Sequence, residues 1–339
     1  MPARIRTGVI GVGALGRHHA RWLSQIEQSE LIGVFDQDYS RSEAHASQLN
    51  CKAFASIEEL LGSVDAVSIA ATTSAHFDIA LACLERGVHC LIEKPVTATM
   101  EQAKELEKSA SKSNVVIMVG QIERFNPAVR ALDQFPIRPS FVEAHRLASF
   151  DPRGTDVAVI LDLMIHDIDL VLTLIKHPVA DIQSAAVGVI SAAPDICNAR
   201  LTFANGSVAN LTSSRISLVA MRKMRLFQPE GYVALDLAKR EADIYRLIPE
   251  GSQEEGFRLP MGKSGREILY TKIGDSGGDM LGTELTTFLR VIQGEIPNPI
   301  PLADGVRALD VALEVERIGR AAAKRVIGSE SMTDLTATP

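Results

Sequence analysis

The first third of the chain alternates short apolar runs with longer segments of helical period. The apolar runs, which suit buried parallel strands, cover residues 5–10, 31–35, 51–53, 66–71, 89–92 and 115–119. The helical segments cover residues 18–26, 41–49, 77–86 and 100–113, and Ser56 with Glu59 marks the start of a further short helix. This alternation predicts βαβ units and a parallel sheet with right-handed crossovers.

The pattern changes after Gly120, where strand-like runs follow one another with few helices between them. We expect strands at 140–149, 182–191, 198–203, 207–213, 222–228, 232–236, 241–247 and 267–273. Asn205-Gly206 lies between two of them and is a typical hairpin sequence. Helices are expected at 127–132, 280–293 and 305–326. The second part is therefore predicted to be an α+β domain with a mostly antiparallel sheet.

Length and composition fit a two-domain enzyme. The chain has 339 residues, of which 46% are hydrophobic and 23% are charged. We place the first domain at 1–122, the second at 123–328 and a polar tail at 329–339.

Several classes of protein are excluded by the same numbers. The net charge is −7 without a basic block, so nucleic acid is not an expected partner. Apolar runs stay below the about 20 residues that span a bilayer, so membrane insertion is not expected. The strand at Ile5 leaves no room for a signal peptide, which favours a cytoplasmic protein. The four cysteines form no C-x-x-C pair, so we expect reduced thiols and no metal site.

A glycine-rich turn connects the first strand to the first helix. Its sequence is Gly11-Val12-Gly13-Ala14-Leu15-Gly16, a G-x-G-x-x-G pattern. Gly11 permits the tight turn, Gly13 lets a pyrophosphate approach the backbone, and Gly16 lets the helix pack closely. The N–H groups at the helix start then bind phosphates. The alternative is a glycine-rich turn that binds no ligand. The preceding strand, the following helix and the acid after the second strand together predict dinucleotide binding. We expect His18 and His19 on the surface of this helix.

Asp36 ends the second apolar run, 20 residues after Gly16. An acid at this distance accepts hydrogen bonds from the adenosine ribose hydroxyls. Its charge and that of Asp38 repel a 2′-phosphate, so the sequence favours NAD over NADP. Arg41 is a nearby cation that favours the opposite choice.

Polar clusters also follow two later strands of the first domain. Residues 72–76 follow one strand, and Glu93-Lys94-Pro95 follows the next. Ligands of parallel sheets bind beyond the carboxyl ends of the strands, so we expect Lys94 beside the nicotinamide. A solvated lysine in an ordinary turn is the alternative. Thr72 and His76 are candidates too, although His76 also suits a role in capping or packing the next helix.

Residues 159–172 predict a largely buried helix with a polar stripe. At about 100° per residue, Asp162, His166 and Asp169 share one face. Buried polar groups are costly unless they face a wet cavity or satisfied partners. The stripe therefore predicts a pocket where Asp162 orients His166 and His166 exchanges a proton with substrate. A purely structural network is the alternative.

Taken together, the glycine turn, Glu93-Lys94-Pro95 and Asp162-x-x-x-His166 resemble the glucose–fructose oxidoreductase / inositol dehydrogenase family over about residues 4–326. The resemblance implies a Rossmann domain followed by an open-faced sheet that often builds dimers or tetramers. It implies NAD(P)-dependent hydride transfer at a carbohydrate or cyclitol hydroxyl, with Lys94 and His166 catalytic and Asp162 supporting. The residues predicted to contact the cofactor are Gly11, Gly13, Ala14, Leu15, Gly16, Asp36, Thr72, His76, Glu93, Lys94 and Gln121. The family's T-P-x-x-x-H loop has Thr73 in place of proline.

Softer motifs at 121–127 and 143–156 resemble the branch that acts on UDP-activated amino sugars such as UDP-N-acetylglucosamine, in lipid A biosynthesis. Arg124, Arg146 and Arg153 are candidates to pair with a diphosphate, or ordinary surface arginines. The predicted substrate contacts are Lys94, Arg124, Asn126, Arg153, Asp162 and His166. A free-polyol dehydrogenase of the inositol type is the alternative enzyme. A catalytically silent NAD-binding sensor is the alternative outside enzymes, although it has no need for Lys94, Asp162 and His166 together.

Overall fold

The computed structural model describes residues 4–150, 157–261, 264–275 and 277–333, with side chains to residue 324. The chain forms two compact units. The first contains Met1–Phe125 and Gly278–Leu309, and the second contains Asn126–Gly277 and Asp310–Pro339. The sequence assigned residues 278–309 to the second domain, whereas here they pack with the first unit.

Direct contacts explain this return of the chain. A Cβ atom on Gly282 would lie 3.0 Å from the indole ring of Trp22. The Asn298 side chain donates a hydrogen bond to the Ile117 carbonyl at 2.8 Å, and the Val119 N–H donates to the Ile300 carbonyl at 3.1 Å. Such contacts join residues far apart in the sequence, which local patterns do not reveal.

A six-stranded parallel sheet forms the centre of the first unit, as predicted. The strand order is β3-β2-β1-β4-β5-β6. The strands are β1 Ile5–Ile10, β2 Ser29–Phe35, β3 Lys52–Ala53, β4 Ala66–Ile69, β5 His89–Glu93 and β6 Ile117–Gly120. The direction of winding reverses between β1 and β4, which is where parallel sheets of this kind bind ligands.

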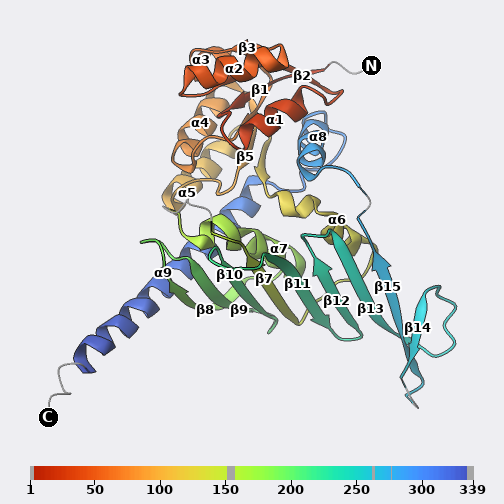
Figure 1. Cartoon of the computed structure of the whole chain (residues 1–339). Helices are drawn as coiled ribbons and strands as arrows, with labels where there is room; N and C mark the ends of the chain where they lie inside the picture. Colours follow the sequence, from red (N-terminus) through yellow and green to blue (C-terminus); the bar gives the residue numbers. More distant parts are fainter. Residues whose placement is uncertain (1–3, 151–156, 262–263, 276, 334–339) are drawn as a thin grey trace. The chain divides into compact units, whose positions relative to one another are not determined.

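The sequence predicts most helices of the first unit in the right places (Figure 1). However, the helices expected at 18–26 and 77–86 are observed at Gly16–Leu23 and Thr73–Arg86, so His76 lies within a helix. Ser56 caps one of them by accepting a hydrogen bond from the Glu59 N–H at 3.2 Å, and Gly87 ends another with a left-handed φ of 68°. The helices are α1 Gly16–Leu23, α2 Tyr39–Leu49, α3 Ile57–Leu61, α4 Thr73–Arg86, α5 Met100–Ala110, η1 Ile122–Phe125 and α8 Met280–Ile292.

The second unit is built on a nine-stranded sheet in the order β14-β15-β13-β12-β11-β7-β10-β9-β8 (Figure 1). In the described part of this sheet, β7 and β10 run parallel and the other neighbours run antiparallel. The strands are β7 Phe141–Leu147, β8 Val179–Val187, β9 Ile196–Phe203, β10 Val208–Ser214, β11 Met221–Gln228, β12 Gly231–Asp236, β13 Glu241–Pro249, β14 Phe257–Pro260 and β15 Arg266–Ile273.

The remaining helices are α6 Pro127–Arg130, η2 Ala131–Gln134, η3 Ile160–Met164, α7 Ile165–Ile175 and α9 Leu302–Thr333. Helix α7 packs on β7 and β10, and α9 approaches β8, where a Cβ atom on Gly319 would lie 2.7 Å from the Ala186 side chain. Because α9 reaches Thr333, the tail predicted from residue 329 begins later, and residues 334–339 lie outside the described part. The prediction also missed β14.

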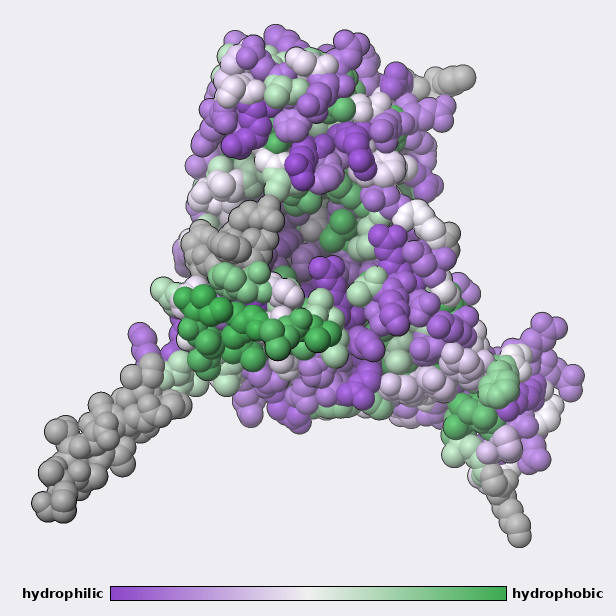
Figure 2. Space-filling model, in the orientation of Figure 1, coloured by the Kyte–Doolittle hydropathy of each residue, from purple (hydrophilic) through white to green (hydrophobic). Residues whose placement is uncertain are grey.

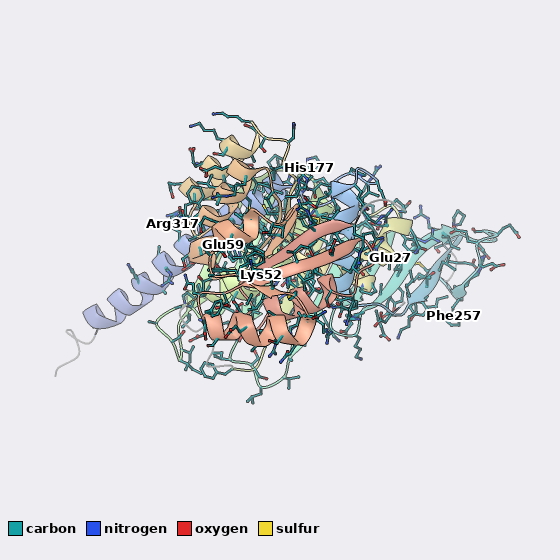
Figure 3. All side chains as sticks on the ribbon, turned by 90° about the horizontal axis from the view of Figure 1, so that it is seen from above. Glu27, Lys52, Glu59, His177, Phe257 and Arg317 are labelled. Atoms are coloured by element: carbon teal, nitrogen blue, oxygen red, sulfur yellow. The ribbon has the colours of Figure 1, made fainter. Side chains whose placement is uncertain are left out.

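The two faces of the second sheet differ in character. Strand β7 alternates, with Val142, Ala144 and Arg146 buried and the residues between them half-buried. On the other face a row of aromatic rings crosses the strands, with neighbouring ring centroids 4.9 to 5.6 Å apart. The row comprises Phe141, Phe227, Tyr232, Tyr245 and Tyr270. It continues to Phe257, which is 63% exposed and is labelled in Figure 3.

Aliphatic side chains are exposed at one end of this sheet. Strand register places Val187, Ile196 and Ser214 side by side, so the loops that follow these strands lie at the same end. Figure 2 shows a hydrophobic patch on the second unit. The exposed aliphatic residues of this end, named here the aliphatic patch, are Val187, Val189, Ile190, Ile196, Leu218 and Val219. In the described residues, no helix has the length and apolar character needed to cross a bilayer.

Candidate functional site

The glycine turn has the geometry that phosphate binding requires. Gly11 has a φ of 86°, and a Cβ atom there would lie 2.8 Å from the backbone of Ala70. A Cβ atom on Gly16 would lie 1.8 Å from the Gly11 carbonyl oxygen, so that position excludes any side chain. Gly13 has no heavy atom within 4 Å of the corresponding position. The turn therefore leaves open backbone at Gly13, immediately before the start of α1.

Asp36 lies at the end of β2 and is fixed against this turn. One carboxylate oxygen accepts the Val12 N–H at 2.9 Å, and the other accepts the Asp38 N–H at 3.0 Å. The Arg41 guanidinium approaches the same carboxylate at 3.2 Å. A carboxylate has further lone pairs, so these contacts leave acceptor capacity for a ribose. Arg41 is the residue that a 2′-phosphate would recruit.

The Lys94 turn is held by His76. Lys94 and Pro95 are joined by a cis peptide bond. His76 Nδ1 lies 2.9 Å from the Pro95 carbonyl oxygen, and its Nε2 lies 3.1 Å from that of Ala71. Burial lowers the pKa of the His76 imidazole, and the two carbonyl oxygens oppose this shift. Both ring nitrogens face the protein backbone, so the structure gives His76 a structural role, and its contact with a cofactor stays a prediction.

A buried polar chain lies behind the same turn. The Lys94 N–H donates to the Glu93 carboxylate at 3.3 Å. His19 Nε2 lies 3.2 Å from the other Glu93 oxygen, and His19 Nδ1 lies 2.7 Å from the Ser68 hydroxyl. His19 is fully buried, which contradicts the surface position expected for it. The local sequence does not show that this face of the helix turns toward the sheet, where His19 approaches Ser68 on β4 and Glu93 on β5.

Two further candidates lie at neighbouring strand ends. Gln121 follows β6 and is buried, and its side-chain oxygen has no hydrogen-bond partner among the described residues. Thr72 precedes α4, and its hydroxyl lies 3.3 Å from that of Ser74. An unpaired buried amide oxygen requires an explanation, and a bound ligand provides one.

In the second unit, Asp162 and His166 lie on either side of a change in helical pitch. Residues 160–164 form a π-helical turn, η3, and α7 continues from Ile165. Wide turns of this type occur frequently at functional sites. The 100° spacing assumed from the sequence does not hold through η3, which changes the direction of Asp162 relative to the stripe. Asp162 and His166 are half-buried, whereas Asp169 is 1% exposed.

Buried ion pairs anchor this segment. Arg146 on β7 donates two hydrogen bonds to Asp167 on α7, at 3.0 and 2.8 Å. Their side chains are only 4% and 3% exposed. The proposal that Arg146 pairs with a diphosphate is therefore wrong, because its guanidinium faces the core. The sequence pattern did not reveal this pair, because its two residues lie on elements far apart in the chain.

A second buried pair holds the start of η3. Arg215 donates to Asp195 at 2.9 Å and to the Val157 carbonyl at 2.7 Å. Burial opposes ionisation of Asp195, but donors from residues 189–191 hold the pKa of this carboxyl well below its usual range. The pair thus connects the loop between β8 and β9 to the approach of the His166 segment.

Arg124 and Asn126, two of the predicted substrate residues, make side-chain contacts within the protein. Arg124 is 11% exposed and pairs with Asp304 at 2.7 Å. Asn126 is buried, donates to the Leu237 carbonyl at 2.9 Å and caps α6 by accepting the Ala128 N–H at 3.1 Å. Arg153 lies outside the described residues. These contacts show structural roles for Arg124 and Asn126, and their contact with substrate stays a prediction.

In comparisons with known proteins, each of the two parts of the chain matches a family model. A family model described as "Oxidoreductase family, NAD-binding Rossmann fold" matches residues 5–121. A second, described as "GFO/IDH/MocA C-terminal domain", matches residues 138–233.

Individual relatives cover nearly the whole chain. A UDP-N-acetylglucosamine 3-dehydrogenase of Acidithiobacillus ferrooxidans is 39% identical over 318 residues, which cover 92% of this chain and 96% of the relative. A solved structure of the protein with that name from the same organism has a TM-score of 0.85 at 37% identity, covering 94% of this chain and 98% of that one. A myo-inositol 2-dehydrogenase of Thermotoga maritima is 24% identical over 90% of this chain and 93% of the relative.

Proposed function

The chain belongs to the Gfo/Idh/MocA oxidoreductase family, and we propose that it is an NAD-dependent dehydrogenase of a UDP-activated amino sugar. UDP-N-acetylglucosamine, oxidised at position 3, is the first candidate substrate. The observation that carries this proposal is the 39% identity to the Acidithiobacillus enzyme over 92% of the chain. Relatives named for inositol are more distant, at 24% to 31% identity.

The residues of the first unit fit a nicotinamide dinucleotide. The open backbone at Gly13 suits a pyrophosphate, and Asp36 retains acceptor capacity for the ribose hydroxyls. Gln121 has an unpaired amide oxygen at the end of β6, which suits the carboxamide of the nicotinamide. NAD is preferred to NADP because the Asp36 carboxylate repels a 2′-phosphate. When bound, the nicotinamide would supply an acceptor for the hydride that leaves the substrate carbon.

Side chains of the protein are proposed to accept the proton of the substrate hydroxyl. The hydroxyl proton must leave as the hydride departs, and a group with a pKa near the operating pH is suited to accept it. His166 is the proposed base, Asp162 is proposed to orient its ring, and Lys94 stabilises negative charge on the hydroxyl oxygen.

A substrate screen tests the function directly. Purified protein is incubated with NAD⁺ and each of several UDP-sugars, myo-inositol and glucose, and NADH is followed by absorbance. We expect turnover with UDP-N-acetylglucosamine or a close UDP-sugar. Saturable turnover of myo-inositol alone would favour the polyol enzyme. NAD⁺ binding without turnover of any sugar would favour the silent sensor.

The cellular setting follows from the same proposal. A role in lipid A biosynthesis and a cytoplasmic location fit a nucleotide-sugar substrate. A homo-oligomer, either a dimer or a tetramer, is supported by the aliphatic patch, in which Leu218 is 100% and Val219 is 74% exposed. Monomers rarely leave a contiguous apolar surface uncovered. Light scattering of the purified protein measures the oligomeric state.

A further inference from the structure

Glu284 on α8 is fully buried, with 0% of its surface exposed. Neither of its carboxyl oxygens has a hydrogen-bond partner among the described residues. An ionised carboxylate in this state would lose its hydration with nothing to replace it, which is among the most unfavourable arrangements in a protein interior. The proposed function makes no use of this residue, so its state requires an explanation.

Among the described residues, no lysine or arginine is buried beside Glu284, and His19 is the one buried imidazole on the helices that pack against it. Helix α8 packs against α1 and η1. The titratable or charged residues of these elements are Arg17, His18, His19, Arg21, Glu123 and Arg124. Of these, His19 and Glu123 are buried, and Arg124 pairs with Asp304. On β5, the carboxylate of Glu93 acts electrostatically on Glu284.

The two carboxyl groups differ sharply in their donors. Glu93 accepts the Lys94 N–H, and His19 Nε2 lies 3.2 Å from the same carboxylate without making a hydrogen bond. Glu284 has neither kind of contact. The geometry therefore disfavours a negative charge on Glu284, which has no donor, and favours a proton on this carboxyl. Burial raises the pKa of the Glu284 carboxyl well above its usual range, and the charge on Glu93 raises it further.

We propose that Glu284 is a neutral carboxylic acid that adds no second charge to repel Glu93, and so acts as a positioning residue for Lys94. Glu93 holds the backbone N–H of Lys94, so any force that displaces Glu93 also displaces this lysine. A second carboxylate in the same dry region would repel Glu93. The catalytic half of this inference rests on the proposed function, whereas the protonation state does not.

Infrared spectroscopy tests the protonation state without any substrate. We expect the carbonyl band of a protonated carboxylic acid in the wild-type protein at neutral pH. The band should disappear in Glu284→Gln and persist in a Glu255→Gln control, because Glu255 is exposed. Absence of such a band from the wild type, or its persistence in Glu284→Gln, would overturn the proposal.

Stability provides a second test, with a definite sign. The pKa of Glu284 is raised in the folded state, whereas in the unfolded state it has its ordinary value of about 4.5. Above about pH 4.5 the folded protein therefore binds one more proton than the unfolded chain, and the free energy of unfolding falls as pH rises toward the folded-state pKa. Glutamine keeps the shape and neutrality without titrating. The denaturant midpoint of Glu284→Gln should therefore rise relative to wild type between about pH 5 and about pH 8. A difference that does not change with pH contradicts a neutral Glu284.

Activity tests the positioning role. The kcat/KM of the wild type should decline on the alkaline side as Glu284 ionises, and this decline should move to higher pH in Glu284→Gln. Glu284→Lys, if folded, should lose activity while circular dichroism stays unchanged. Identical pH profiles for wild type and Glu284→Gln would reject the positioning role even if the infrared band were present. If the sugar screen gives no turnover, the infrared and stability results still decide the protonation state.

Discussion

A Cβ atom on Gly16 would lie 1.8 Å from the carbonyl oxygen of Gly11, whereas a Cβ atom on Gly13 would meet no heavy atom within 4 Å. The three glycines of the turn are therefore required for different reasons. Gly11 and Gly16 are fixed by the protein itself. Gly13 is open, and we expect that a bound pyrophosphate is what excludes a side chain there.

Alanine substitutions should separate these two reasons. Gly16→Ala should lower the thermal midpoint and weaken NAD⁺ binding, because the turn must move to admit the methyl group. Gly13→Ala should keep the wild-type thermal midpoint and still weaken NAD⁺ binding by about tenfold or more, a change of about 1.4 kcal/mol. Calorimetric titration and thermal melts measure both quantities. Normal NAD⁺ binding by a folded Gly13→Ala protein would remove the turn from the cofactor site.

The cofactor preference should depend on Asp36. In Asp36→Ser the repulsion of a 2′-phosphate weakens, and Arg41 loses its partner at 3.2 Å, keeping its pair with Asp38 at 3.4 Å and gaining freedom to bind the phosphate. We expect the ratio of kcat/KM for NAD⁺ over NADP⁺ to fall at least tenfold. In the double variant with Arg41→Ala, the gain with NADP⁺ should be lost. Wild-type protein that uses NADP⁺ as well as NAD⁺ would show that Asp36 does not set the preference.

The sequence predicted those features that local rules determine. The alternation of apolar runs identified every strand of the first sheet, and the glycine spacing located the turn before α1. Capping rules located Ser56 and Pro127 correctly, because a cap is satisfied by neighbours within a few residues. In each case the cause lies within one short stretch of chain.

Long-range contacts were the part that local rules missed. Residues 278–309 join the first unit through contacts such as Asn298 with Ile117. The burial of His19 and the pair of Arg146 with Asp167 likewise depend on elements distant in sequence. The π-helical turn at 160–164 has no signature in the apolar period, which continues smoothly through it.

Asp195 should make a pH-dependent contribution to stability. Its pKa is lowered in the folded state, so its contribution is fully present above the ordinary value of about 3.8 and is lost as pH falls below it. Asp195→Asn should destabilise the protein by about 3 kcal/mol at pH 7, since Arg215 is left buried without its charge partner. The difference from wild type should shrink as pH falls below about 4.

Denaturant titrations at several pH values measure this difference. The exposed Asp181→Asn is the matched control on β8, and it should change stability by less than about 0.5 kcal/mol at every pH. An Asp195→Asn deficit that stays constant down to pH 3 would mean that the lost stability comes from packing and not from ionisation.

The last prediction concerns the proposed proton transfer. His166→Ala should lower kcat by about 10²- to 10⁴-fold, the usual contribution of a general base, and should leave NAD⁺ binding near normal. Lys94→Ala should lower kcat at least as much, because it removes the charge that stabilises the developing alkoxide. His177→Ala is the matched control, since His177 is exposed just beyond the end of α7. The pH dependence of the residual kcat distinguishes the two roles. The acidic limb of the kcat profile reports the group that must be deprotonated to accept the proton. Loss of this limb in His166→Ala would therefore identify His166 as the base. If His166→Ala kept the limb and nearly full kcat with its fold intact, Lys94 or a bound water would be the acceptor, and the role of Asp162 would then be structural.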